Sequence, residues 1–139
     1  VLGLVGLNGA GKTTTLRLCS GVLLPSSGKI YIDGMDIEKE KKEASKAIGW
    51  VPEAPNFNLA ETPMMLMRYY STLYDIEKEE AKKISSDLLS AVGLEEKCHN
   101  LSFTKMSQGM KKRFMIASAL LANPDNILLD ETINGLDPS

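Results

Sequence analysis

The sequence of 139 residues predicts an α/β fold with a mainly parallel sheet and an inserted all-helical subdomain. Residues 1–5 form an apolar segment that leads through a glycine-rich loop into a helical pattern. The apolar run 127–129 ends in two acids, as a central parallel strand does. We expect one domain over residues 1–139, truncated at both ends. Its parts are an α/β core in residues 1–56 and 107–139 and a helical insert in residues 57–106.

The elements of the core are placed by turn-forming residues and by the period of the apolar positions. Short apolar or alternating runs between glycine and proline predict strands, and spacings of three and four predict helices. In chain order we expect strand 1–5, helix 12–22, strand 29–33, a charged helix or loop at 38–47, strand 48–51, helix 107–122 and strand 127–129.

Two helices are expected in the insert. Thr62 is a capping residue and Pro63 suits the first helical position, so the first helix begins there. Asp75 is expected to cap the second helix, whose first turn carries three glutamates, as the helix dipole favours. Gly93 is the expected stop.

Composition excludes several classes of protein. The formal net charge of −2 provides no basic field, so no nucleic-acid partner is expected. No apolar run reaches the ~18 residues that a membrane-spanning helix needs. Cys19 and Cys98 lack the spacing of a metal site and are expected to be free thiols. His99 lies in a polar connector and is expected at the surface.

The strongest functional signal is the glycine-rich motif Gly6–Thr13, which fits G-x-x-x-x-G-K-[ST], the phosphate loop of nucleotide triphosphatases. Backbone N–H groups and a helix N-terminus hold phosphate in such a loop. Lys12 is expected to reach the β- and γ-phosphates, and the Thr13 hydroxyl to bind Mg²⁺. The alternative is a chance glycine turn before a helix. The expected nucleotide-binding residues here are Asn8, Gly9, Ala10, Gly11, Lys12, Thr13 and Thr14.

Two acidic residues form a second candidate site. Asp130 and Glu131 follow the apolar run, and the carboxyl ends of parallel strands line the ligand crevice in folds of this kind. Asp130 is expected near Mg²⁺, and Glu131 is expected to orient or deprotonate the attacking water. The alternative is an acidic turn after a strand.

A third motif begins the helix at residue 107. Ser107, Gln108 and Gly109 precede three basic residues, and the first helical turn carries no acid. Such a terminus can bind an anion, so phosphate could be gripped from two sides, by two copies of the chain. Ordinary capping by Ser107 explains the pattern equally well.

In the order of these motifs the chain resembles the nucleotide-binding subunit of ATP-binding cassette (ABC) transporters, over essentially its whole length. Gly6–Thr14 looks like the Walker A loop, and Glu53 stands at the glutamine of the Q-loop. Met106–Met110 looks like the signature sequence, and Asn126–Glu131 like Walker B. Residues 134–137 are similar to the D-loop. The resemblance implies a P-loop NTPase core, and the form of the motifs is similar to an exporter-type branch.

The resemblance also implies how such a subunit works. Two ATPase subunits, identical or different, sandwich two ATP molecules with Mg²⁺, each nucleotide lying between Walker A of one subunit and the signature of the other. Hydrolysis then drives a multi-span membrane permease, which holds the subunit at the cytoplasmic, inner face of the cell membrane. By position Glu131 is the catalytic residue, Thr13, Glu53 and Asp130 serve the metal, and Ser107 and Gly109 meet the γ-phosphate. In this family a helix of the permease docks beside the insert, where Met65 is the candidate contact.

Several features depart from the family pattern. Thr132 stands where proline usually follows the glutamate, and Ile133 where threonine or serine is common. A switch histidine is expected after the D-loop, and His99 does not occupy that position. We therefore expect the fragment to hydrolyse ATP poorly when made alone. Two other interpretations remain: a soluble, non-transport ABC ATPase, and a nucleotide-binding regulatory module with little turnover.

Overall fold

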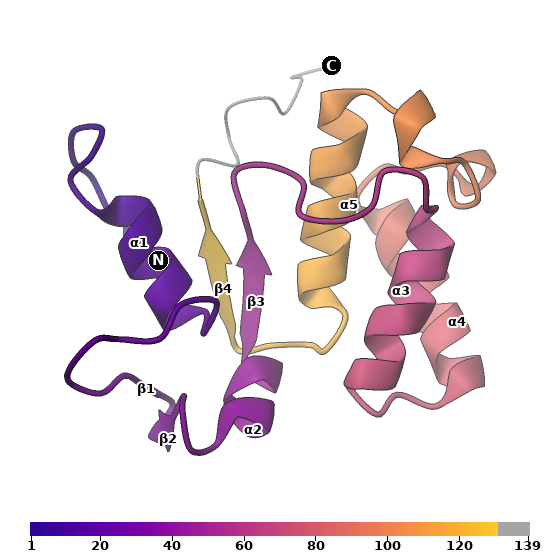
Figure 1. Ribbon diagram of the computed structural model, residues 1–139. Helices are drawn as coiled ribbons and strands as arrows, with labels where there is room; N and C mark the ends of the chain where they lie inside the picture. Colours follow the sequence, from indigo (N-terminus) through magenta and orange to yellow (C-terminus); the bar gives the residue numbers. More distant parts are fainter. Residues whose placement is uncertain (131–139) are drawn as a thin grey trace.

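The computed structural model describes residues 1–130. A central pair of strands has α1 on one side and a group of helices on the other (Figure 1). In chain order the elements are α1 (Lys12–Cys19), β1 (Tyr31–Ile32), β2 (Met35–Asp36), α2 (Lys41–Lys46), β3 (Ile48–Val51), α3 (Pro63–Leu73), α4 (Lys78–Ala91), the 3-10 helices η1 (Glu96–Cys98) and η2 (Phe103–Lys105), α5 (Gln108–Leu120) and β4 (Asn126–Leu129). None of the described helices is both long and apolar enough to cross a membrane.

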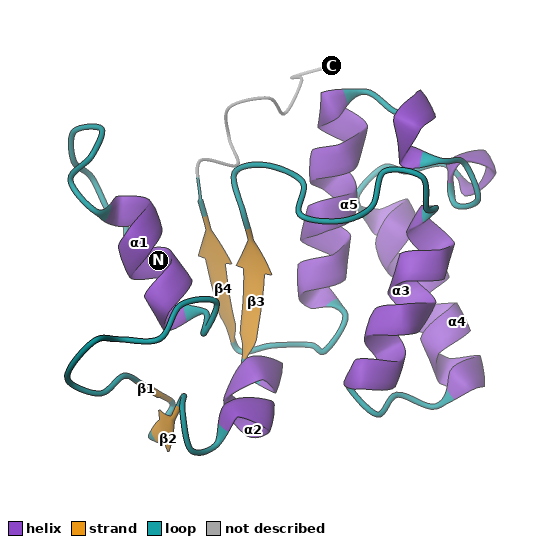
Figure 2. Cartoon of the chain, viewed as in Figure 1, coloured by secondary structure: helices purple, strands orange, loops and turns teal. Residues whose placement is uncertain are grey.

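The two central strands are parallel, as the sequence predicts. Ile48 of β3 lies opposite Asn126 of β4, and Val51 lies opposite Leu129. Their arrowheads point to the same edge (Figure 2). Helix α5 packs closely on β3. A Cβ added to Gly49 would lie only 2.5 Å from the carbonyl oxygen of Ala119. The strand can therefore carry nothing larger than glycine there without a shift of the helix.

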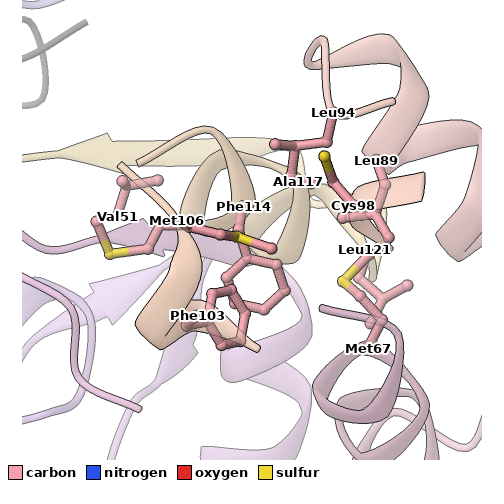
Figure 3. Packing of buried hydrophobic residues seen from close by; sticks show 11 residues of the cluster. Val51, Met67, Leu89, Leu94, Cys98, Phe103, Met106, Phe114, Ala117 and Leu121 are labelled. Carbon is pink, nitrogen blue, oxygen red and sulfur yellow. The ribbon is translucent and has the colours of Figure 1, made fainter. Parts of the chain in front are cut away.

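The hydrophobic core joins the strands to the helices of the insert. Val51, Met67 and Leu89 are fully buried and come from β3, α3 and α4. Phe103 and Phe114 pack with their ring centroids 4.7 Å apart beside this group (Figure 3). Their tilted arrangement is one that aromatic pairs favour. One core therefore fixes the insert helices against α5 and β3.

The N-terminal segment does not form the predicted strand. Residues 1–7 have no regular secondary structure, and Leu2 and Val5 are each 95% exposed. A strand needs a neighbour to pair its backbone N–H and C=O groups, and no described strand pairs with this segment. The strand prediction for residues 1–5 is wrong for this structure, although the apolar pattern behind it is present. Helix α1 likewise buries none of its residues.

The predicted strand 29–33 is part of a hairpin instead. Tyr31 pairs with Asp36, and Ile32 pairs with Met35, in an antiparallel register. Asp33 and Gly34 have φ of 50° and 80°, the left-handed values that a tight two-residue hairpin turn requires. The Asp-Gly pair is a strong signal for this turn, so the sequence itself indicates the hairpin.

The cap of the second insert helix lies two residues later than predicted. The Glu77 carboxylate accepts hydrogen bonds from the N–H groups of Glu79 (2.9 Å) and Glu80 (3.4 Å) and so caps α4. Asp75 has a φ of 58° in the turn before it, and its carboxylate lies 2.7 Å from Lys42 Nζ. Asp75 therefore links the turn between α3 and α4 to α2.

His99 is buried rather than at the surface, with 2% of its area exposed. Its Nε2 lies 3.0 Å from the carbonyl oxygen of Leu94, and its own carbonyl accepts a hydrogen bond from the N–H of Met64 at 2.9 Å. The connector therefore packs under the start of α3 and satisfies a free N–H of that helix. Cys19 and Cys98 are free, as predicted.

Candidate phosphate-binding site

The predicted phosphate loop lies directly before α1 (Figure 1). Gly9 and Gly11 have φ of 83° and 98°, a backbone region that glycine enters without the penalty of a Cβ. Gly11 is the N-cap of α1, and no side chain caps the helix there. Because the N–H groups of a first helical turn lack intrahelical partners, this terminus presents donors and a partial positive charge to an anion.

Lys12 folds back over this loop. Its Nζ donates hydrogen bonds to the carbonyl oxygens of Gly6 and Leu7, the second at 3.0 Å. The N–H of Ala10 also donates to the Leu7 carbonyl, at 3.1 Å, and closes the turn. The ammonium group is therefore held beside the loop that would carry phosphate, as a mobile cation at the end of a flexible side chain.

A pocket of about 420 Å³ opens at the loop. Its lining residues are Asn8, Gly9, Gly11, Lys12, Thr13, Thr14 and Glu53. All seven are site residues predicted from the sequence, and among residues 1–130 no residue outside the predicted set lines the pocket. Ala10 belongs to the predicted set but does not line the pocket. Residues more than 40 positions apart in the sequence therefore meet where the resemblance places a metal and a triphosphate.

Asp130 shares a different cavity with Lys12. Both residues line a second cavity, of about 720 Å³, between the N-terminal segment and β4. Asp130 is 4% exposed, and its N–H donates to the carbonyl of Val51 at 3.0 Å. The hydrogen bond aligns the carboxyl ends of β3 and β4, so Lys12 has Glu53 in one of its cavities and Asp130 in the other.

The donors present fit a magnesium ion that is held partly by phosphate. Thr13, Glu53 and Asp130 offer one hydroxyl and two carboxylates, the hard oxygen ligands that Mg²⁺ takes. Among residues 1–130, no three acidic, histidine or cysteine side chains gather in a cluster that could hold a metal by itself. Mg²⁺ commonly binds through one or two carboxylates plus substrate phosphates, and this donor set matches that pattern.

The signature residues lie away from the pocket. Ser107 is the N-cap of α5, and its hydroxyl accepts a hydrogen bond from the N–H of Met110 at 3.2 Å. Ser107, Gln108 and Gly109 do not line the phosphate pocket. Ser107 therefore caps α5, as one of the two interpretations predicts. A contact of these residues with a nucleotide held by another subunit stays a prediction. Glu131, Thr132 and Ile133 and the D-loop residues lie outside the described residues.

Comparison with known proteins gives consistent matches. A family model described as ABC transporter matches residues 1–134. The bacitracin transport ATP-binding protein BcrA of Bacillus licheniformis is 41% identical over 138 residues, which are 99% of this chain and 44% of that protein. The Nod factor export ATP-binding protein I of Burkholderia thailandensis is 36% identical over 140 residues, covering 98% of this chain and 44% of the relative.

One of the solved structures that match is a dimer. The dimeric post-hydrolysis state of an ATP-binding cassette bound to ADP and Pi matches with a TM-score of 0.82 and 29% identity. The match covers 96% of this chain and 61% of that structure. The chain thus spans less than half the length of the curated relatives it matches.

Proposed function

Since this chain belongs to the ABC transporter family, we propose that it forms the ATP-binding part of a subunit that hydrolyses ATP to power an exporter. One observation carries the proposal: Lys12 lines both the pocket of the glycine loop and the cavity that contains Asp130. Such a juxtaposition lets one lysine and one metal ion act on the same triphosphate.

The predicted site residues would divide the work as follows. The N–H groups at the start of α1 hold the β-phosphate, and Lys12 neutralises charge on the β- and γ-phosphates. Thr13 and Glu53 would offer oxygen ligands to Mg²⁺, and Asp130 would hold it through a water. When bound, the ion would neutralise negative charge on the phosphates. Glu131 would orient the attacking water.

A second ATPase subunit would complete the site. Ser107 and Gly109 lie outside the phosphate pocket of their own chain, which is what a site shared between two subunits requires. The matching cassette structure is described as dimeric, which supports this arrangement.

A membrane permease is the third component. Met65, Tyr69 and Leu73 are 56%, 58% and 54% exposed and recur every four residues, so they form one apolar stripe on α3. Met67, by contrast, is fully buried. The stripe suits a helical segment of the permease, and methionine adapts to such partners. The subunit would then sit at the inner face of the membrane through that partner. The relative described as a Nod factor export protein supports the outward direction.

The test uses the full-length protein. Wild type, Lys12→Ala and Lys41→Ala are compared for Mg²⁺-dependent ATP hydrolysis, since Lys41 is exposed on α2 outside the phosphate pocket. The proposal requires turnover in wild type and Lys41→Ala and its loss in Lys12→Ala. Equal turnover in all three variants would refute it.

The permease is tested separately, in vesicles that contain the membrane partner. Met65→Asp places a charge on the apolar stripe, and Lys82→Asp places one on the exposed side of α4. Permease stimulation of ATP hydrolysis should fall in the first variant and persist in the second. Unchanged stimulation in Met65→Asp would rule out the stripe as the docking surface. Turnover that no membrane partner alters would favour a soluble ABC ATPase.

A further inference from the structure

The charge balance of the phosphate pocket differs from that of a simple anion site. Of its seven lining residues only Lys12 and Glu53 carry a charge, and these two charges cancel. The first turn of α1 adds no acid. Attraction for a phosphate chain that carries several negative charges therefore comes from Lys12 and from the partial charge of the helix terminus, and the charge of Glu53 opposes it.

Among residues 1–130, no ion pair neutralises Glu53. The ammonium group of Lys12 donates to the carbonyl oxygens of Gly6 and Leu7. The ion pairs found in residues 1–130 join Lys42 and Lys46 to Asp75 and Lys97 to Glu95, so none of them involves Glu53. Glu53 is exposed, on the loop that follows β3, and it lines the same pocket as the loop glycines.

Asp130 adds a second negative charge behind Lys12. It is almost completely buried, and Lys12 is the only basic side chain among the described residues that line its cavity. The linings of the two cavities hold one lysine and three carboxylates, those of Glu53, Asp125 and Asp130. A bound triphosphate would meet an excess of negative charge unless a divalent cation entered with it.

We infer that Glu53 makes nucleotide binding conditional on a divalent cation: its carboxylate repels metal-free ATP from the pocket and attracts the magnesium complex of ATP. The inference rests on the proposed function and deepens it, by assigning to one residue the rejection of metal-free nucleotide. Binding coupling is reciprocal, so the factor by which Mg²⁺ tightens ATP binding is also the factor by which ATP tightens Mg²⁺ binding.

Replacement of Glu53 by glutamine separates charge from shape. The amide keeps an oxygen ligand and nearly the same size but removes the negative charge. Metal-free ATP should then bind about tenfold more tightly than to wild type, because one like charge near the phosphates is gone. The factor by which Mg²⁺ tightens ATP binding should fall correspondingly. Glu38→Gln makes the same change at an exposed position outside the pocket and is the matched control.

The experiment is equilibrium ATP binding to the full-length protein, measured by titration calorimetry with excess EDTA and then with Mg²⁺. Manganese, detected by electron spin resonance in the presence and absence of ATP, reports the same coupling from the metal side. We expect tighter metal-free binding in Glu53→Gln and wild-type behaviour in Glu38→Gln. Circular dichroism melts of the three proteins check that all are folded.

The other outcomes contradict either the inference alone or the proposed function with it. Equal metal-free affinities of wild type and Glu53→Gln overturn the inference and leave the proposed function intact, provided that wild type binds ATP with Mg²⁺. A gain in both Glu53→Gln and Glu38→Gln also overturns it, because the effect is then one of net charge. If wild type binds ATP under neither condition, the proposed function fails and the inference fails with it.

Discussion

The N–H of Asp130 donates a hydrogen bond to the carbonyl of Val51 at 3.0 Å, where β3 and β4 reach their carboxyl ends together. The bond fixes how far each strand extends before its chain leaves the sheet. Glu53 follows two residues after Val51, and Asp130 directly follows Leu129, the last residue of β4. Both carboxylates therefore lie at one edge of the sheet, where α/β folds bind their ligands.

Ser107 offers a way to separate helix capping from phosphate binding. Ser107→Ala removes the oxygen that accepts from Met110 N–H, so the free energy of unfolding should fall by about 1 kcal/mol. Ser107→Asp keeps a capping oxygen and should be as stable as wild type. Its negative charge should nevertheless weaken ATP-dependent dimerisation. Urea unfolding and sedimentation measure the two effects, and normal dimerisation of Ser107→Asp would confine Ser107 to capping.

Removal of the catalytic carboxylate should arrest the cycle after ATP binding. In the full-length protein we expect Glu131→Gln to abolish turnover and to accumulate an ATP-bound dimer, because the attacking water is no longer activated. Size-exclusion chromatography with saturating ATP and Mg²⁺ detects the dimer. A Glu131→Gln protein that stays monomeric under these conditions would contradict a nucleotide shared between two subunits.

Gly49 should tolerate no side chain. The Cβ of Gly49→Ala would lie 2.5 Å from the carbonyl oxygen of Ala119, so β3 and α5 must move apart. We expect a loss of about 1–3 kcal/mol in the free energy of unfolding. Ser90→Ala, at an exposed position on α4, should change it by less than ~0.5 kcal/mol. A Gly49→Ala protein as stable as wild type would mean that α5 does not pack on β3 this closely.

The ion pair between Lys42 and Asp75 should give a pH-dependent contribution to stability. The hydrogen bond and charge of Lys42 hold the pKa of Asp75 below its ordinary value of 3.8, and Lys46 adds to this. A group whose pKa is lowered on folding contributes stability above its unfolded pKa and loses it as the pH falls through its folded pKa. Asn tolerates the positive φ, so Asp75→Asn should be less stable than wild type at about pH 7. The difference should shrink as the pH falls below 3.8 and vanish below the folded pKa of Asp75.

The pair is exposed, so its effect should be small and should shrink in high salt. Thermal melts of wild type and Asp75→Asn across this pH range measure it. Lys97→Gln, which breaks the exposed pair of Lys97 in η1 with Glu95 just before it, provides a comparison that does not involve α2. A difference between wild type and Asp75→Asn that persists at low pH would show that Asp75 acts through its backbone turn instead.

Local signals in the sequence predicted most of the site and the parallel strand pair. The spacing of glycines, lysine and threonine identifies the loop, because each residue type has one task there. The apolar run before Asp130 predicted β4, and Ile48–Val51 predicted β3 with the bounds that the structure shows. The meeting of Glu53 with the loop came only from the resemblance, since more than 35 residues separate Glu53 from Thr14.

The errors have two physical sources. Residues 1–5 have the pattern of a strand, but a strand depends on a neighbour that the local pattern does not describe. His99 and Asp75 were misplaced because tertiary contacts decide their positions: a polar connector folds under α3, and two lysines of α2 hold the turn that carries Asp75. The Asp33-Gly34 pair is a local signal for a hairpin turn, whereas only a strand was predicted at residues 29–33.

The central claim is that one triphosphate lies between the glycine loop and the acids at the strand ends. A structure of the full-length protein with Mg²⁺ and a non-hydrolysable ATP analogue tests it most directly. The account predicts the β-phosphate within hydrogen-bond distance of the N–H groups of Gly11 and Lys12, and the metal between Thr13 and the side of Asp130. A nucleotide bound elsewhere, with Lys12 still on the Gly6 and Leu7 carbonyls, would contradict it.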